Sequence, residues 1–295
     1  MNKGLLFAII SPLVSGIATI LLGGASKLLH PLVILSLAPL IGGVLLALFL
    51  LSRGEKFKAK ELKQNSKELF LLITVRQIIG WIPFVIALTF TDAIKAIFLT
   101  KVEPYFVLFW HWLIKKEPVK PRHIFLLVIH VSGAILLSTG GRFTLGKAQL
   151  GDLFIVASMA TSSLSYIWAT SLTRKIGAIK TNSFMLLIAG LIFLPFALLV
   201  SPASGWINLT GWAYLIGYTV LFSTIGLTLW FISLKSVRGW IVSALRALSP
   251  LLAAPFAYFL FGQTLSVVQI LGGIVVLITS FLIAKEHLDS AKKTS

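Results

Sequence analysis

Residues 5–29 read LLFAIISPLVSGIATILLGGASKLL, an apolar run of 25 residues in which Lys27 is the only charge. A helix needs about 20 predominantly apolar residues to cross the hydrocarbon core of a bilayer. The run is too long for the apolar region of a secretory signal peptide, and it shows no clear small-residue cleavage site. It therefore predicts a first membrane-spanning helix.

Nine similar stretches follow along the chain. The ten predicted spans lie at residues 4–28, 32–52, 68–90, 93–113, 122–140, 151–172, 182–200, 210–233, 240–261 and 266–285. Composition agrees, because 57% of the residues are hydrophobic and 12% are charged, against roughly 25% charged in a soluble domain. Lipid solvates the outward face of each helix, so apolar residues are tolerated all round. The sequence predicts an all-α integral membrane protein whose surroundings are the lipid bilayer.

The basic residues between the spans predict an orientation. With the N-terminus inside, the inner gaps hold 19 lysines and arginines and the outer gaps hold three. Because cytoplasmic loops retain positive residues, both termini are predicted to be cytoplasmic. The compact chain, without a long targeting extension, favours the plasma (inner) membrane of a prokaryote. The net charge of +17 therefore does not indicate a nucleic-acid partner, because helices that lie in lipid cannot form a basic face that binds nucleic acid.

Several chemistries are excluded by the residues that the chain lacks. It has no cysteine, which removes disulfides, thiolate metal sites and cysteine nucleophiles. No spacing of histidines and carboxylates resembles a metal site, and no phosphate-binding loop is present. We therefore expect no cofactor, no metal and no direct ATP drive.

The chain also repeats itself. A shift of 147 residues places the first predicted helix on the sixth, with Ser11 on Ser158. A shift of 146 places the fourth on the ninth, with Pro104 on Pro250. The predicted halves are residues 1–146 and 147–295. Each half has five helices, and because five is odd, the second half starts from the opposite side of the membrane. The repeat is therefore inverted, as in many transporters whose substrate lies between the halves near the midplane.

Charges inside apolar helices are the main functional signal. A charge at a helix centre costs roughly 2.5–3.5 kcal/mol on the insertion scale. Lys101 and Glu103 lie near the middle of the fourth predicted helix and point about 200° apart, so they cannot readily pair with each other. Each needs a partner on another helix, water or a ligand. Arg246 lies at the equivalent depth in the ninth helix, and cations from both halves would suit a carboxylate or a phosphate.

Other residues complete the predicted site. The substrate-binding candidates are Lys101, Glu103, Arg246, Arg76, Gln77, Trp81, Tyr105 and Tyr166, and the hinge candidates are Pro104 and Pro250. Snorkelling toward the headgroups is the alternative for the arginines, and core packing is the alternative for the aromatic residues. Lys95 is interpreted as an interface residue, and His130 as a packed, hydrogen-bonded core residue. Glu103 is also a candidate proton carrier, so coupling of transport to protons is one hypothesis. A homodimer is another hypothesis that the sequence does not decide.

These residues carry a resemblance to a known family. The segments that carry the resemblance are Phe90-Thr91-Asp92-Ala93 and Glu103-Pro104, Gly151-Asp152-Leu153, Thr173-Arg174-Lys175, Ser243 to Leu251, Phe261-Gly262-Gln263-Thr264-Leu265, and Gln269-Ile270-Leu271-Gly272-Gly273. Together they resemble the EamA-like branch of the drug/metabolite transporter superfamily over nearly the whole chain. Two departures are Ser15-Gly16, where the family often has Trp-Gly, and Gln263, where it usually has glutamate.

The resemblance implies export or exchange of small metabolites such as amino acids. In related branches of the superfamily the substrates are nucleotide sugars or sugar phosphates. An exchanger of organic phosphates or nucleotide sugars is therefore the alternative function. We expect a secondary transporter that works by alternating access and has a small-molecule substrate, not an enzyme. A membrane-embedded enzyme is a less favoured hypothesis, because no ordered catalytic motif joins the polar residues near the interfaces.

Overall fold

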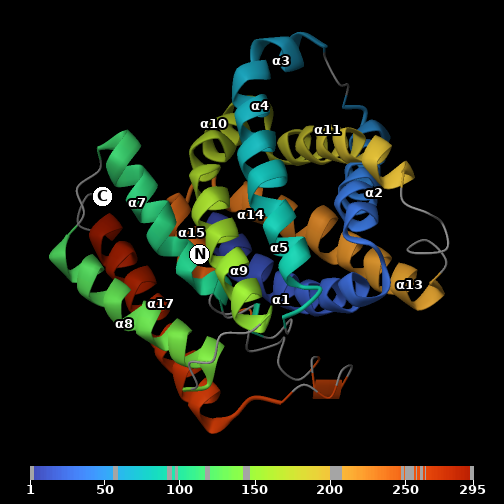
Figure 1. Ribbon diagram of the computed structural model, residues 1–295. Coiled ribbons are helices and arrows are strands. Elements are labelled where there is room, and N and C mark those ends of the chain that lie inside the picture. Colours follow the sequence, from blue (N-terminus) through green and yellow to red (C-terminus); the bar gives the residue numbers. More distant parts are fainter. Residues whose placement is uncertain are drawn as a thin grey trace.

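The computed structural model shows a bundle of helices, with no strand in the part of the chain that it describes (Figure 1). The described residues are 3–55, 59–91, 95–96, 99–116, 120–141, 147–199, 208–246, 249, 256, 258–259, 262 and 264–292.

The first half contains α1 (Lys3–Leu28), α2 (Pro31–Ser52), α3 (Ala59–Gln64), α4 (Ser66–Ile73), the π-helical segment η1 (Thr74–Gly80), α5 (Trp81–Ala87), the 3-10 turn η2 (Thr100–Val102), α7 (Glu103–Lys115) and α8 (Pro121–Thr139). The second half contains α9 (Lys147–Leu164), α10 (Tyr166–Ile176), α11 (Ala178–Leu198), α13 (Leu209–Tyr218), the π-helical segment η3 (Thr219–Gly226), α14 (Leu227–Ser233), α15 (Gly239–Leu245) and α17 (Val267–Lys292).

Local sequence explains several helix ends. His30 precedes α2, and its Nδ1 accepts a hydrogen bond from the Leu32 amide at 3.3 Å. Asn208 caps α13 in the same way, with its side-chain oxygen 2.8 Å from the Gly211 amide nitrogen. Such side chains satisfy amides that have no partner in the first turn of a helix.

The helices fit a multi-pass membrane protein. Within the described residues, five helices are long and apolar enough to cross a bilayer, and a sixth candidate joins α9 and α10, which meet at a bend of 42°. Large apolar side chains face outward, including Phe125 (65% exposed) and Leu198 (67% exposed), and lipid is the medium that accepts such a surface. The count of ten spans stays a prediction, because predicted spans 93–113 and 240–261 lie partly outside the described residues.

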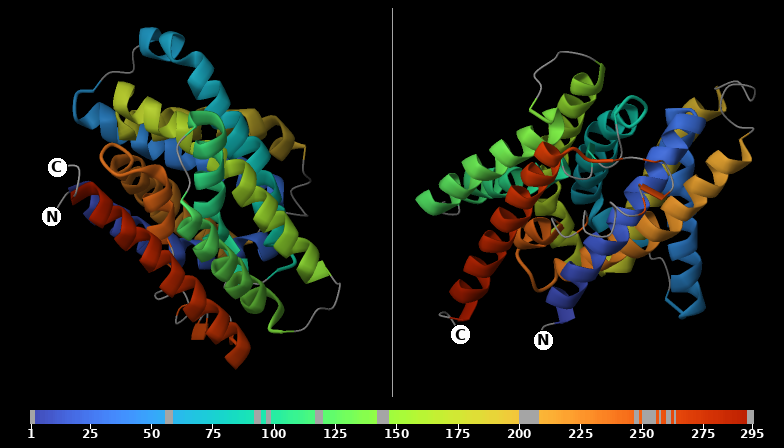
Figure 2. Two further views of the ribbon diagram at one scale, coloured as in Figure 1. Left: turned by 90° about the vertical axis from the view of Figure 1, so that its left-hand side faces the viewer. Right: turned by 90° about the horizontal axis from the view of Figure 1, so that it is seen from below.

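Figure 2 shows both marked chain ends on the same side of the bundle. An even number of crossings brings the two ends of a chain to the same side of a membrane, so this placement agrees with an even count.

The two halves interlock. α2 packs on α11, and α8 packs on α17, so the second and fifth predicted spans of each half meet their counterparts. α1 packs against α13, η3 and α14, while α9 packs against η1 and α5. The first helix of each half therefore contacts the third predicted span of the other half. A two-fold axis that relates the halves would produce this reciprocal pair of contacts.

A pair of hydrogen bonds repeats this relation at atomic level. Ser11 donates to the carbonyl of Gly226 at 2.8 Å, and Ser158 donates to the carbonyl of Gly80. Each glycine ends a π-helical segment, η3 or η1. A π-helical turn is rare and is found mostly at functional sites, and here one occurs at the same place in each half. The sequence match of Ser11 with Ser158 thus marks an equivalent structural position.

The predicted proline hinges have different outcomes. Pro104 lies in the first turn of α7, directly after η2, where the 3-10 turn gives way to the α-helix, and its role as a hinge stays a prediction. A proline fits there because first-turn amides have no partner inside the helix. Pro250 lies outside the described residues.

Candidate functional site

A cavity lies between the halves at the level of the two π-helical segments. It is lined by Ser15, Thr19, Ala38, Pro39, Arg76, Gln77, Gly80, Trp81, Phe84, Thr100, Lys101, Glu103, Ser158, Met159, Ser162, Leu186, Tyr218, Phe222, Ser223, Leu227, Arg246 and Ser249. The cavity has a volume of about 60 Å³. That is room for a few water molecules and less than the roughly 300–1,000 Å³ of a small-molecule site.

Glu103 is the centre of the polar network beside this cavity. Its Oε2 accepts hydrogen bonds from the Tyr166 hydroxyl and the Ser243 hydroxyl, both at 2.9 Å. The same oxygen lies 3.3 Å from Nη1 of Arg246 in an ion pair. Glu103 is 2% exposed, and every partner belongs to the second half. A buried carboxylate is tolerated only when it is paired and hydrogen-bonded in this way.

Lys101 also bonds to the second half. Its Nζ donates to the carbonyl of Arg246 and to Oγ of Ser249, and Ser249 donates to the same carbonyl at 2.9 Å. Proline has no amide hydrogen, so Pro250, four residues later in the sequence, cannot donate a hydrogen bond to this carbonyl. Lys101 and Glu103 therefore find separate partners, as their predicted separation around the helix required.

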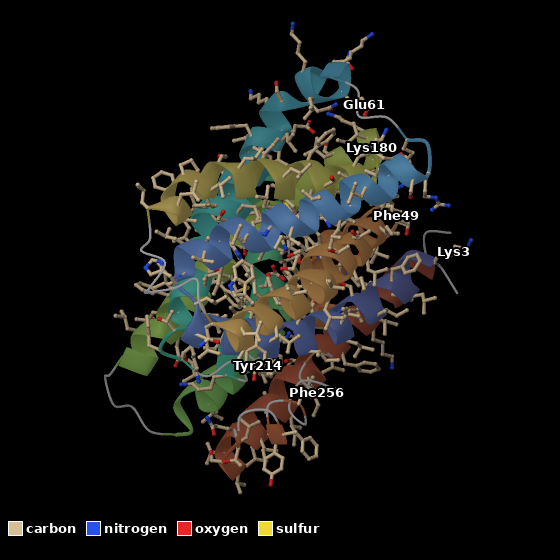
Figure 3. The ribbon with its side chains drawn as sticks, turned by 90° about the vertical axis from the view of Figure 1, so that its right-hand side faces the viewer. Lys3, Phe49, Glu61, Lys180, Tyr214 and Phe256 are labelled. Atoms are coloured by element: carbon tan, nitrogen blue, oxygen red, sulfur yellow. The ribbon has the colours of Figure 1, made fainter. Side chains whose placement is uncertain are left out.

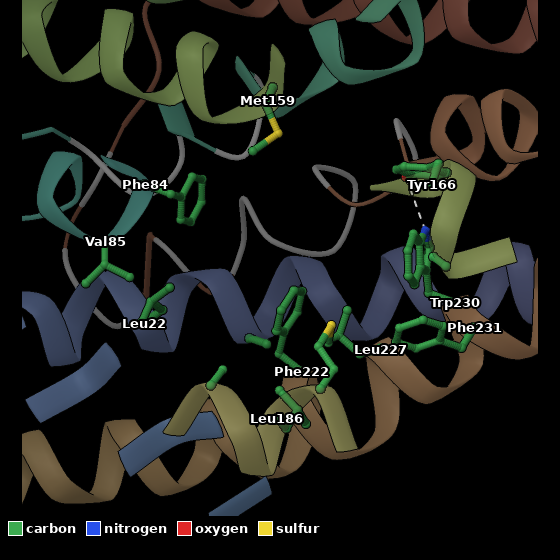
Figure 4. Close-up of a cluster of buried hydrophobic side chains, with 14 of the residues drawn as sticks. Leu22, Phe84, Val85, Met159, Tyr166, Leu186, Phe222, Leu227, Trp230 and Phe231 are labelled. Atoms are coloured by element: carbon green, nitrogen blue, oxygen red, sulfur yellow. Dashed lines mark hydrogen bonds between the residues drawn. The ribbon is translucent and has the colours of Figure 1, made fainter. Parts of the chain in front are cut away.

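Arg76 adds a third cation from the first half. It lies in η1 and is 8% exposed. Its Cζ lies 4.2 Å from the centre of the Trp230 ring, within the range of a cation–π contact, and its Nη1 donates to Ser165 at 3.3 Å. Trp230 in turn donates to the Tyr166 hydroxyl at 3.1 Å (Figure 4). The ring orients Arg76, but it does not neutralise the arginine's charge.

Aromatic rings form another part of the lining. Trp81 is stacked on Phe222 at 5.8 Å and lies 6.1 Å from Tyr218 between ring centres. Figure 4 shows that Phe84, Met159 and Phe222 point toward the same region from three elements. These rings give the lining a planar apolar wall contributed by both halves.

Charge is unbalanced in the described lining. Arg76, Lys101 and Arg246 supply three cations, and Glu103 is the one carboxylate among the described lining residues, which leaves a formal surplus of two positive charges. Ser162 adds a buried hydroxyl that has no hydrogen-bond partner among the described residues. A low-dielectric space with surplus cations and a free hydroxyl favours an anionic ligand.

The structure places the predicted site residues in three ways. Arg76, Gln77, Trp81, Lys101, Glu103 and Arg246 line the cavity. Tyr166 is fully buried behind it and donates to Glu103. Tyr105 is not among the lining residues; its hydroxyl donates to the Leu126 carbonyl at 3.3 Å. Its different direction follows from the 3-10 turn before α7, which turns by about 120° per residue instead of 100°.

Lys95 and His130 lie outside the predicted site, and the sequence predicts them to be an interface residue and a packed core residue. Lys95 was predicted at the membrane interface, but it is 8% exposed and lies 3.0 Å from Asp152 in an ion pair. Asp152, near the start of the second half, thus gives Lys95 a buried partner that the sequence did not indicate, and the depth of Lys95 in the membrane stays a prediction. His130 is fully buried and hydrogen-bonded to Thr279 at 2.9 Å, which confirms it as a packed residue.

Sequence reasoning missed Ser243 and Ser249 as members of the network. Serine is common in apolar helices, so a single hydroxyl carries little signal on its own. The available signal was the register with Arg246, since Ser243 and Ser249 lie three residues to either side of it.

Comparisons with known proteins agree with this fold. The model of the EamA-like transporter family matches residues 2–139 and again 149–285. An "Uncharacterized transporter" of Methanothermobacter thermautotrophicus is 24% identical over 269 residues, covering 86% of this chain and 78% of the relative. The "Uncharacterized transporter YetK" of Bacillus subtilis is 23% identical over 255 residues, covering 80% of this chain and 75% of the relative.

One solved structure, titled "Crystal structure of protein", has the same fold. It aligns with a TM-score of 0.73 at 17% identity and covers 96% of this chain and 98% of that chain. The family match occurs twice along the sequence, which confirms the predicted repeat, and the helices form a multi-pass membrane protein around a shared polar cavity. Both relatives are named as transporters, and the chain belongs to the EamA-like transporter family.

Proposed function

We propose that the protein is a secondary transporter of anionic or zwitterionic small metabolites, with amino acids as the first candidates. The observation that carries this proposal is the surplus of two positive charges among the described residues that line the cavity between the halves. A substrate carboxylate would complete that set, since guanidinium and ammonium groups bind carboxylates through short, charge-assisted hydrogen bonds.

Each charged residue has a distinct proposed role. Arg76 and Lys101 receive the substrate anion, because Arg76 is held by a ring and Lys101 by neutral oxygens. Arg246 stays paired with Glu103 and holds the halves in register. The Ser162 hydroxyl donates the remaining hydrogen bond. Glu103 is the carboxyl through which a proton would be coupled.

Alternating access is the proposed mechanism. The cavity is too small for a metabolite as it stands, so the halves must separate to admit one. At one end of the molecule, ion pairs join the halves: Lys175 to Glu68 at 2.7 Å and Lys180 to Glu61 at 3.5 Å. Figure 3 shows Glu61 and Lys180 close together. We propose that this end faces the cytoplasm, with both termini on that side, in the plasma membrane.

Counterflow in proteoliposomes tests the proposal. Vesicles loaded with amino acids, phosphate esters or neutral sugars are compared for the wild type, Lys101→Ala and Arg76→Ala. Lys67→Ala serves as the control, because Lys67 is exposed and lies outside the cavity lining. We expect the amino-acid signal to fall at least about tenfold in both cavity variants and to persist in the control. Unchanged counterflow in both cavity variants would refute the proposed site.

An organic-phosphate exchanger is the second candidate. A phosphate ester carries up to two negative charges, which equals the surplus in the cavity lining, and the stacked ring of Trp81 would suit a planar group on such a substrate. Competition in the same vesicles separates the candidates. Inhibition by phosphate esters without inhibition by amino acids would select the exchanger.

A further inference from the structure

A second pocket lies beside the first and is separate from it. It has a volume of about 500 Å³ and lies between α7, α10 and the start of α15. The charged and titratable residues that line it are Arg174, Lys175, Arg238 and His111. No carboxylate belongs to its described lining. The charged residues of this described lining are therefore all basic, and the pocket is larger than the central cavity.

The two arginines are available to a ligand. Arg174 and Arg238 are exposed, and neither forms an ion pair with a residue in the described part of the chain. Lys175 differs, because it is held by Glu68 at 2.7 Å. Hydroxyls of Thr170 and Ser171 also line the pocket. Two guanidinium forks with neighbouring hydroxyls form a donor set that suits a carboxylate or a phosphate.

One tyrosine ring separates this pocket from the central network. Gly239 lines the pocket, and a Cβ atom added to it would lie 2.9 Å from Cδ1 of Tyr166. The hydroxyl of that tyrosine donates to Glu103 at 2.9 Å. Tyr166 is fully buried, and the next residue, Ile167, lines the pocket. An anion in the pocket therefore lies one side chain away from the polar network of the cavity.

We propose that this pocket binds a soluble carboxylate or phosphate anion and loads it toward the central cavity past Tyr166. The loading role rests on the proposed transport function, whereas binding of the anion does not. A basic pocket concentrates anions from the adjacent solution, and a concave shape strengthens that effect. Movement of the Tyr166 ring away from Glu103 would open the path and free the carboxylate at the same time.

Arginine modification tests the binding step without a known substrate. Full-length protein in detergent is treated with phenylglyoxal, with and without inorganic phosphate, and modified peptides are quantified by mass spectrometry. Arg53 is the internal control, because it is exposed and lies outside the pocket. We expect saturating phosphate to slow modification of Arg174 and Arg238 about tenfold and to leave Arg53 unchanged. Equal rates at all three arginines, with and without phosphate, would overturn the proposal.

Variants assign the protection to the pair of arginines. In Arg174→Gln, protection of Arg238 should need about tenfold more phosphate, because one fork of the site is gone. Lys235→Gln is the matched control, since Lys235 is exposed near the same turn and does not line the pocket; it should leave the phosphate dependence unchanged. Weakened protection in both variants to the same extent would show a general charge effect and contradict a defined site.

A lipid arm distinguishes the source of the anion. The experiment is repeated in vesicles of phosphatidylcholine alone and of phosphatidylcholine with phosphatidylglycerol. Protection by free phosphate in both vesicles supports a site for soluble anions. Protection by phosphatidylglycerol alone would overturn the proposal, because the pocket would then hold a headgroup. Failure here leaves the central cavity and the counterflow result untouched, so it is distinguishable from failure of the proposed function.

Discussion

Ion pairs join the two halves in more than one region, and two of these regions differ in burial. In the centre, Glu103 and Arg246 are 3.3 Å apart with side chains 3% and 17% exposed. At one end, Glu68 and Lys175 are 2.7 Å apart with side chains 28% and 50% exposed. The shorter pair is the more hydrated one. Because water and mobile ions screen an exposed pair, burial, and not distance, decides which pair matters more for stability and function.

The largest expected effect comes from removing the central carboxylate. Glu103→Ala leaves Arg246 without its anion and leaves Tyr166 and Ser243 without their acceptor. Breaking a buried pair by removing one partner costs about 3–5 kcal/mol. We expect a large loss of thermal stability in detergent. Glu103→Gln should lose less, because its amide oxygen still accepts hydrogen bonds. Equal melting temperatures for wild type and Glu103→Ala would contradict the central network.

A smaller effect is expected where α1 approaches the central region. A Cβ atom on Gly16 would lie 2.4 Å from the backbone carbonyl oxygen of Ser249, which cannot move easily. Gly16→Ala should destabilise the protein by about 1–3 kcal/mol through overpacking. Gly217→Ala is the matched control, because its added Cβ would meet only the flexible end of Leu21 at 2.9 Å. Melting temperatures in detergent give the comparison, and a control as unstable as Gly16→Ala would contradict it.

The smallest effect is expected at the exposed end. Lys175→Gln removes the pair with Glu68, and exposed pairs contribute about 0–1 kcal/mol. The melting temperature should change little, and the small difference should vanish at high salt, where exposed charges are screened. The Glu103 variants should show no such salt dependence. A loss of stability as large as that in Glu103→Ala would reverse the ranking of the two regions.

Most of the fold followed from the sequence because bilayer thickness and hydrophobicity set the lengths of the helices. Predicted spans 4–28, 32–52 and 122–140 differ by one residue at most from the ends of α1, α2 and α8. The repeat followed from residue matches whose structural counterpart is the pair of serine hydrogen bonds, Ser11 to Gly226 and Ser158 to Gly80. The π-helical segments were not predicted, because no residue type marks the insertion of one extra residue in a helical turn.

The candidate site was predicted in part for an equally physical reason. A charge in an apolar helix must find a partner or a wet cavity, so Lys101, Glu103 and Arg246 could be chosen without a structure. Tyr105 was placed with them on the assumption of one continuous helix, which the turn at η2 interrupts. The buried pair of Lys95 and Asp152 was missed because contacts between elements far apart in the chain leave no local pattern.

The central claim, that both halves enclose one positively charged cavity, has a direct test. The chain lacks cysteine, so Thr19→Cys and Ser162→Cys each place a single thiol in the cavity lining, one from each half. Their reaction rates are measured with methanethiosulfonate reagents that carry a sulfonate or a trimethylammonium group, and the rate ratio is divided by that of a small thiol in solution. We predict that both positions favour the sulfonate by about tenfold. A normalised ratio of one or less at either position would contradict the claim.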